Sequence, residues 1–287
     1  MARKTLTTTL VKKFIPARKS KSRKGENGIV LVVGGSYIYH GAPILSSIAA
    51  LRSGTDLVYT SVPKINVAST RSVSPNLIVI PLVDQKLTRG AVNKLLGALP
   101  RKLDSATIGM GLAIQEKNSL LHLVKSLLDR DVRLSLDASA LIPEVLPLLA
   151  NKNVVVTPHA GEFKRLFGQA PSNSKNERIK LVEEKAKEFG ITVLLKGSTD
   201  VISNGNTTYL YEKKIPAMTV GGTGDVLSGL VAGILSKNRK PLESAAAAAF
   251  INGLAGKAVQ KKLGLHMTSM DLLPEIPIVM KPFDKIV

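Results

Sequence analysis

The chain has no cysteine and no tryptophan among its 287 residues, and aromatic residues make up only 4% of it. The lack of cysteine excludes a disulfide framework and a thiolate zinc site. No apolar run reaches the length of about 18 residues that a membrane-spanning helix needs, so we expect no membrane partner. No secretory signal pattern opens the sequence either, and together with the missing cysteines this predicts a cytoplasmic protein.

Two common nucleotide-binding motifs are missing as well. No GxxxxGK[ST] segment occurs, so the chain is not a Walker P-loop protein. No GxGxxG segment opens a helix after the first predicted strand, as it would in a dinucleotide-binding fold. These two absences exclude both kinds of fold.

Acidic residues are scarce, since 21 Asp and Glu stand against 40 Lys and Arg, giving a net charge of +19. We predict that residues 1–24 form a basic N-terminal arm. Its basic residues are Arg3, Lys4, Lys12, Lys13, Arg18, Lys19, Lys21, Arg23 and Lys24, and it has no acid. Such an arm is typical of proteins that bind nucleic acid or steer anionic metabolites, and a transit peptide is a further alternative. Nucleic acid remains the minor interpretation, because no aromatic interleaving or nucleic-acid module accompanies the arm.

The rest of the chain alternates between strand and helix patterns. Strands are expected at 29–33, 57–60, 77–80, 106–108, 133–136, 153–156 and 192–195, and a hairpin at 200–203 and 208–210. Helices are expected at 42–53, 90–99, 116–130, 143–150, 176–189 and from about 225 to 262. This alternation predicts an α/β fold, in which residues 25–287 form one domain with a mostly parallel sheet flanked by helices on both faces.

The segment TVGGTGDVLSGLVAGIL, residues 219–235, is the strongest local signal. Gly221, Gly222 and Gly224 form a turn that enters a helix beginning near Asp225. Open amides and the positive end of a helix attract phosphate or a developing negative charge. Asp225 at such a place fits a group that takes a proton from a hydroxyl or holds a metal. The alternative is structural, because Asp is also favoured in the first turn of any helix.

Ligands of a doubly wound sheet bind at the carboxyl ends of its strands. The residues that follow the predicted strands there are glycines, an aspartate, a histidine, a glutamate and a lysine. They are Gly109, Gly111, Asp137, His159, Glu162, Lys196 and Gly197. We expect them to share one rim of the sheet.

Five blocks resemble a known family. They are VVGGSYIYHGAPILSSIAALRSG (32–54), IGMGL (108–112), VVTPHAGEFKRL (155–166), LLKGSTDVIS (194–203) and VGGTGDVLSGLVAGIL (220–235). In this order they are similar to the nucleotide-dependent NAD(P)H-hydrate dehydratases of the ribokinase-like superfamily, over about residues 24–263. The last block is shared with hydroxyethylthiazole kinase, whereas the GAPILSS and PHAGEF segments favour the dehydratases.

The resemblance implies a reaction and its partners. ATP or ADP, with Mg²⁺, would phosphorylate the C6 hydroxyl of (S)-NADHX or (S)-NADPHX, and loss of phosphate would restore NADH or NADPH. The family also implies a homo-oligomer, a tetramer. A true small-molecule kinase of the hydroxyethylthiazole-kinase type remains the alternative within the fold, and a nucleic-acid-binding protein the alternative of another class.

The resemblance also implies roles for single residues. Asp225 matches the catalytic base, and the anion hole matches Gly222, Thr223 and Gly224. Nucleotide-binding positions match Lys196, Gly197, Ser198, Thr199, Asp200 and Gly224, and hydrate-binding positions match Ala42, Gly111, His159 and Asp225. No metal ligand is assigned. Ala113 departs from the family, which usually has a third glycine there, and we expect a tighter loop.

Overall fold

The strand predicted at residues 29–33 lies near the middle of a ten-stranded sheet, within residues 2–287 that the computed structural model describes. The strands are β1 (Ala2–Thr5), β2 (Ile29–Val33), β3 (Leu57–Pro63), β4 (Ile78–Leu82), β5 (Ser105–Ile108), β6 (Arg133–Leu136), β7 (Val154–Val156), β8 (Thr192–Leu195), β9 (Thr199–Ser203) and β10 (Thr207–Glu212). The helices are α1 (Thr8–Val11), α2 (Gly41–Arg52), α3 (Val67–Val73), α4 (Arg89–Ala98), α5 (Lys117–Leu128), α6 (Leu146–Leu149), α7 (Ala160–Phe167), α8 (Lys175–Phe189), α9 (Thr223–Asn238), α10 (Pro241–Leu263) and α11 (Leu272–Met280).

The strand order is β1-β10-β9-β8-β7-β6-β5-β2-β3-β4, and the pairs from β8 through to β4 are parallel. Strand β9 pairs antiparallel with both β8 and β10, so the predicted hairpin is confirmed. From β2 the chain first builds outward through β3 to β4 and then returns to add β5 on the other side. The point between β2 and β5 is thus the topological switch, where a ligand crevice is expected.

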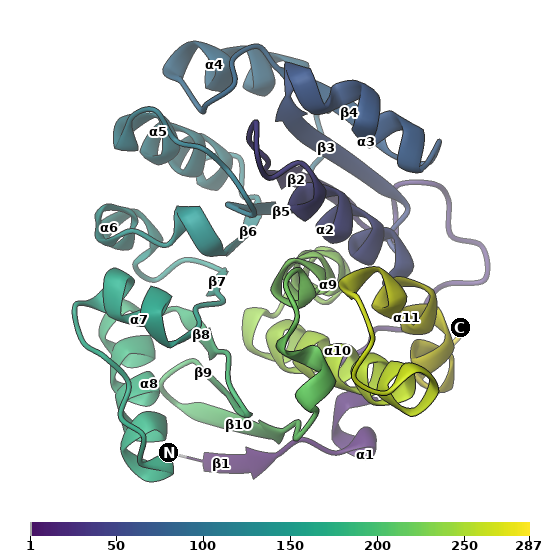
Figure 1. Ribbon diagram of the computed structural model, residues 1–287, viewed down its shortest axis with the longest axis vertical. Helices are drawn as coiled ribbons and strands as arrows, with labels where there is room; N and C mark the ends of the chain where they lie inside the picture. Colours follow the sequence, from purple (N-terminus) through teal and green to yellow (C-terminus); the bar gives the residue numbers. More distant parts are fainter. Residues whose placement is uncertain (1) are drawn as a thin grey trace.

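Helices cover both faces of the sheet (Figure 1). One face packs against α4 to α8, and the other against α2, α9, α10 and α11. Side chains of β7 show how the strands serve both layers, because Val154 and Val156 belong to the first core and Val155 to the second. Successive side chains of a strand point to opposite faces of the sheet. Because helices cover both faces here, both sets of side chains are apolar and the strand is an unbroken apolar run in the sequence.

The helix predicted to continue to about residue 262 is in fact two helices. Arg239 ends α9 in a left-handed conformation with φ of 67°, and Pro241 begins α10. The apolar pattern hides this break because α9 and α10 pack tightly on each other and both bury most of their length. Helices α1, α3, α7 and α11 are absent from the prediction; α1 spans four residues and α7 eight, and α11 carries Pro277 in its interior.

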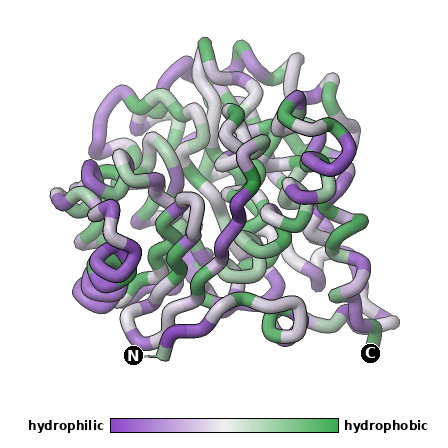
Figure 2. The backbone as a smooth tube through the Cα atoms, turned by 60° about the horizontal axis from the view of Figure 1, so that its bottom comes forward, coloured by the Kyte–Doolittle hydropathy of each residue, from purple (hydrophilic) through white to green (hydrophobic). Residues whose placement is uncertain are grey.

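The basic N-terminal segment packs on the body of the fold. Strand β1 pairs in parallel with β10, and Arg3 makes two hydrogen bonds of 2.9 and 2.8 Å to Glu183 of α8. Phe14 and Ile15 are buried in the same core as α9 and α10. Figure 2 shows α8, the most hydrophilic helix, as a purple coil at the left edge of the molecule. Along residues 2–287, no helix combines the length and the hydrophobicity needed to cross a membrane.

Candidate active site

A cavity of about 610 Å³ opens at the switch point between β2 and β5. Its walls come from the segments that follow β2, β4, β5 and β6, together with the first turns of α2 and α9. Its lining residues are Ser36, Tyr37, Ile38, Tyr39, Ala42, Gln85, Lys86, Gly111, Leu112, Ala113, Ala138, Ser139 and Asp225. Three of the four residues predicted for the hydrate therefore share one cavity.

The two loops of this cavity touch through their small residues. Gly111 has φ of 63°, and a Cβ atom there would lie 2.7 Å from Cβ of Tyr39 and 3.3 Å from Cβ of Ala42. Gly35 also donates a backbone hydrogen bond of 2.8 Å to the carbonyl oxygen of Met110. The close approach explains why glycine stands at position 111, since a side chain would separate the walls.

The N-terminus of α9 is open to a ligand. Gly222 is the N-cap with φ of 91°, and no side chain caps the first turn of the helix. The side chain of Thr223 turns back instead and donates to the carbonyl oxygen of Met218 at 3.1 Å. The first amides of a helix have no partner within it, so those of Thr223 and Gly224 are available to an anion. A Cβ on Gly224 would lie 3.5 Å from Nζ of Lys196, which puts that ammonium group at the same helix end.

Asp225 is half-buried in the first turn of α9 and faces the cavity. Burial, followed by the negative charge of Asp137, raises its pKa from 3.8 to about 7, although Lys196 acts in the opposite direction. The helix is held in place because Oγ of Ser46 donates to the backbone oxygen of Asp225 at 2.7 Å. A carboxyl group that changes charge near neutral pH can accept a proton from a substrate hydroxyl.

Lys196 lies between two carboxylates. Its Nζ atom is 2.8 Å from Oδ1 of Asp137 and 3.5 Å from Oε2 of Glu162. Burial by itself would lower the pKa of Lys196. The two carboxylates have the larger effect and raise this pKa above its usual value, so the side chain is a cation. With Asp225, three carboxyl groups meet one ammonium group at the carboxyl end of the sheet.

The rest of the predicted nucleotide segment forms the turn from β8 to β9. The amide of Gly197 donates to Oδ1 of Asp200 at 3.0 Å, and Nζ of Lys213 lies 2.8 Å from the same oxygen. Asp200 is fully buried, and its burial raises its pKa. Ser198 accepts a backbone hydrogen bond from Lys213. Asp200 thus shapes this turn, and Thr199 begins β9 beside it.

His159 stands apart from the other residues predicted for the hydrate. It is the N-cap of α7, where its Nδ1 accepts from the amides of Gly161 and Glu162 at 3.0 and 3.3 Å. Its side chain is 61% exposed and is not part of the cavity lining. Glu162 completes the capping box and also reaches Lys196, so His159 lies on the Lys196 side of the site.

Comparison with known proteins identifies the family of the chain. The family model for NAD(P)H-hydrate dehydratase matches residues 30–278. A protein from Nitrosopumilus maritimus (strain SCM1), named ADP-dependent (S)-NAD(P)H-hydrate dehydratase, is 96% identical over 286 residues, which cover 100% of both chains. The chain belongs to the NAD(P)H-hydrate dehydratase family.

Solved structures confirm the ribokinase-like fold of this dehydratase family member. The ADP/ATP-dependent NAD(P)H-hydrate dehydratase from Bacillus subtilis, co-crystallized with ATP/Mg²⁺, has a TM-score of 0.84 at 26% identity and covers 98% of each chain. A ribokinase-like superfamily protein from Enterococcus faecalis V583 has a TM-score of 0.81 at 24% identity, covering 99% of this chain and 97% of that one. The second likeness concerns the fold alone.

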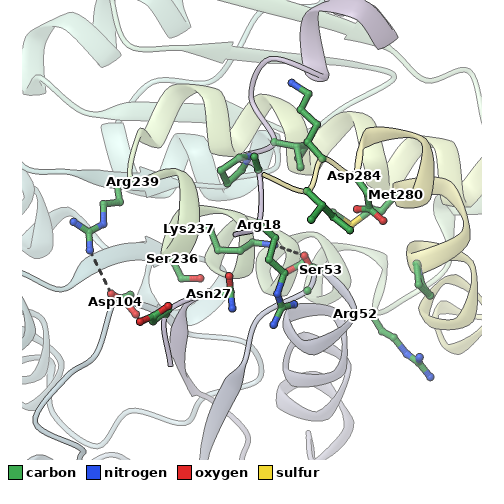
Figure 3. A pocket seen from close by; sticks show the side chains of 18 residues that line it. Arg18, Asn27, Arg52, Ser53, Asp104, Ser236, Lys237, Arg239, Met280 and Asp284 are labelled. Carbon is green, nitrogen blue, oxygen red and sulfur yellow. Dashed lines mark hydrogen bonds and ion pairs between the residues drawn. The ribbon is translucent and has the colours of Figure 1, made fainter. Parts of the chain in front are cut away.

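A second cavity of about 420 Å³ lies at the opposite end of the sheet in this dehydratase-family chain (Figure 3). Its lining includes residues that directly precede β2, β3 and β5 or lie close to their starts, namely Asn27, Gly54 and Asp104. Lys237, at the carboxyl end of α9, donates to the carbonyl oxygen of Ser53, and burial lowers the pKa of this lysine to about 8. Arg239 lies 3.8 Å from Asp104. Lys237 thus satisfies the carboxyl end of α2, and none of the predicted site residues lines this cavity.

Sequence reasoning missed several residues of the dehydratase-family cavity. Tyr37 and Tyr39 lie within a quoted block, and their side chains are 67% and 63% exposed on the cavity wall. Gln85 and Lys86 follow β4 at the carboxyl end of the sheet. The rule that ligands bind beyond the carboxyl ends of strands points to these two residues once β4 is known to end at Leu82 rather than at residue 80.

Proposed function

We propose that the chain is an ADP- or ATP-dependent dehydratase that returns (S)-NADHX and (S)-NADPHX to NADH and NADPH. The observation that carries this proposal is the place of Asp225, between an open helix N-terminus with Lys196 on one side and the cavity with Ala42 and Gly111 on the other. One side suits the phosphates of a nucleotide and the other a hydrated nicotinamide ring. The relative that is 96% identical is named ADP-dependent, which supports ADP as the preferred donor.

The chemistry follows from the poor quality of hydroxide as a leaving group. Asp225 would take the proton of the C6 hydroxyl as its oxygen attacks the terminal phosphoryl group of the nucleotide. The amides of Gly222, Thr223 and Gly224 would stabilise the charge on that phosphoryl group. Phosphate then leaves with the electrons of its C–O bond, and loss of a ring proton restores the double bond. The net reaction releases AMP from ADP, or ADP from ATP, together with inorganic phosphate.

The nucleotide would lie along the turn of residues 196–200 and the first turn of α9. Lys196 supplies a cation next to Gly224, and Gly197 to Asp200 fix the turn. His159, on the same side of Asp225 as Lys196, would contact the hydrate only where the substrate extends past the cavity.

Mg²⁺ fits this site through its oxygen ligands. Within residues 2–287 no cluster of three or more acidic, His or Cys side chains could hold a metal by itself. Mg²⁺ usually keeps water and phosphate oxygens and takes one or two carboxylates. Asp137 and Glu162, both beside Lys196, are the carboxylates that would hold it. When bound, the ion would offset the negative charge of the transferred phosphoryl group.

The decisive experiment is a turnover assay with the purified chain. NADHX or NADPHX is mixed with ADP or ATP and Mg²⁺, and the absorbance of the reduced nicotinamide and the release of phosphate are followed together. A dehydratase gives both signals in equal amounts. The alternative of a small-molecule kinase predicts a stable phosphorylated product without free phosphate.

Three further proposals accompany this function. We take residues 1–24 as a basic arm and 25–287 as the catalytic domain, acting as a homo-oligomer, a tetramer, in the cytoplasm. Light scattering of the purified chain tests the tetramer. A steep loss of affinity with salt would reveal the nucleic-acid-binding alternative.

A further inference from the structure

We propose that Lys86 binds a phosphate group of the hydrated dinucleotide and so anchors the substrate at the mouth of the cavity. This inference rests on the proposed function, because it concerns the same cavity. It adds a charged contact to a site whose predicted residues, Ala42, Gly111 and Asp225, include no cation.

The charge pattern of the cavity points to Lys86. Among the residues that line it, Lys86 is the one cation and Asp225 the one anion. Along residues 2–287 the ammonium group of Lys86 has neither a carboxylate within 4 Å nor a hydrogen-bond acceptor, although many other exposed lysines of the chain are paired. A substrate that places its ring at Asp225 must keep its phosphates away from that carboxylate, so a separate cation suits it.

The backbone around Lys86 is fixed against the wall of the cavity. Leu87 is fully buried, and its amide donates to the carbonyl oxygen of Ala113 at 2.7 Å. The amide of Gln115 donates back to the carbonyl oxygen of Leu87 at 3.1 Å, so the two loops form a short parallel bridge. Lys86 is thereby held close to Gly111, two residues before Ala113. A lysine on a fixed backbone loses less entropy on binding than one on a mobile loop.

The next helix fixes the other side of the same turn. Thr88 is the N-cap of α4 and accepts from the amide of Ala91 at 3.1 Å, and its hydroxyl also bonds to Asp84. The turn thus has an anchor on each side of Lys86, and the lysine side chain is left exposed. On the same cavity lining, Tyr37, Ile38 and Tyr39 offer exposed apolar surface that suits a ring, but they offer no charge to a phosphate.

Both substrates carry a diphosphate, and NADPHX also carries a phosphate on its adenosine ribose. Lys86→Ala should therefore raise KM for one or both by about tenfold, the scale of one charge-assisted hydrogen bond. The turnover number and KM for ADP should stay within about twofold, because Lys86 touches neither Asp225 nor the nucleotide turn. Lys86→Arg should restore KM, and Lys86→Glu should raise it further. Lys94→Ala, an exposed lysine of α4 outside the cavity, is the matched control.

The arms of the experiment separate the two phosphate sources. A rise of KM for NADPHX alone assigns Lys86 to the ribose phosphate, and equal rises for both assign it to the diphosphate. The hydrate of reduced nicotinamide riboside, which has no phosphate, should be turned over equally by the parent and by Lys86→Ala. Unchanged KM for both dinucleotides, or an equal loss with the riboside, overturns the proposal.

A binding measurement keeps this test independent of turnover. Calorimetric titration of NADPH and NADH into the chain, at low and at moderate salt, should show weaker binding by Lys86→Ala and a smaller salt dependence. If the parent binds both dinucleotides but turns over neither hydrate, the proposed function fails while the binding role of Lys86 is still tested. Binding that is unaffected in Lys86→Ala contradicts the anchor.

Discussion

Replacing Asp225 by Asn should make the protein more stable at pH 8 and nearly inactive. Burial raises the pKa of this carboxyl group from 3.8 to about 7 in the folded chain. As the pH rises, the Asp225 carboxyl loses its proton in the unfolded chain before it does so in the folded chain. The free energy of unfolding therefore falls between about pH 4 and about pH 7, and the loss is complete above that range. A shift of about three units sets a ceiling of roughly 4 kcal/mol for this loss.

Asn keeps the shape of the side chain and removes its charge, so the free energy of unfolding of the variant does not fall with pH in this way. We expect the variant to be more stable than the parent by about 2 to 4 kcal/mol at pH 8 and by almost nothing at pH 4. In a chain of this length that corresponds to a Tm higher by several degrees at pH 8. Both proteins should be melted without nucleotide or Mg²⁺, since either ligand would shift the equilibrium.

The same substitution should lower turnover by about 10²-fold or more, the scale of losing a general base. Nucleotide binding should be retained, because the amides of α9 remain in place. In the parent, kcat/KM should rise with pH through about 7 as Asp225 loses its proton, and this rise should be absent from the residual activity of the variant. Turnover within a factor of a few of the parent would falsify the role as base. Equal melting curves at pH 8 would show that the carboxylate carries no uncompensated charge.

Gly222→Val should abolish nucleotide binding and destabilise the fold, because φ is 91° at this position and a Cβ atom would lie 2.4 Å from Oγ of Ser269. Gly221→Ala is the control for both measurements, because the space around Gly221 is open. His159→Ala should weaken binding of NADPH and spare that of ADP in calorimetric titrations, and loss of ADP with normal NADPH binding would place the residue in the nucleotide site instead. Deleting residues 2–20 should lower the Tm markedly, because it removes β1 and buried Phe14, yet leave kcat unchanged in the cold, because none of these residues lines the cavity. A lower kcat with the fold intact would show that the arm reaches the site.

The sequence predicted the central strands well, because buried parallel strands give short apolar runs that end in turn residues. Ile29–Val33, Arg133–Leu136 and Thr192–Leu195 have the predicted bounds. The strands at the edges of the sheet are harder to predict from the sequence. Strand β1 is mostly polar and its four residues are exposed, and only its pairing with β10 makes it a strand, so no local pattern could reveal it.

The candidate site was predictable where backbone geometry dictates the residue. The glycines at 111 and 222 have positive φ and crowded surroundings, and both were expected at the site. Lys86 could not be found in this way, because an exposed lysine has no signature of its own. Its place depends on the bridge between Leu87 and Ile114, which joins segments that lie far apart along the chain.

The unequal charges at the site give a physical reason for the nucleotide to bind together with Mg²⁺. Asp137, Glu162 and Asp225 face one ammonium group, that of Lys196, and burial already raises the pKa of Asp225 to about 7. A nucleotide without Mg²⁺ would add negative charge to this cluster and raise that pKa further. Mg²⁺ held by Asp137 and Glu162 would offset the charge of the nucleotide, which would lower the pKa of Asp225 and favour the carboxylate that accepts a proton. Asp225 should therefore become a base when the metal-bound nucleotide is in place, and the hydroxyl of the hydrate is then deprotonated next to its phosphoryl acceptor.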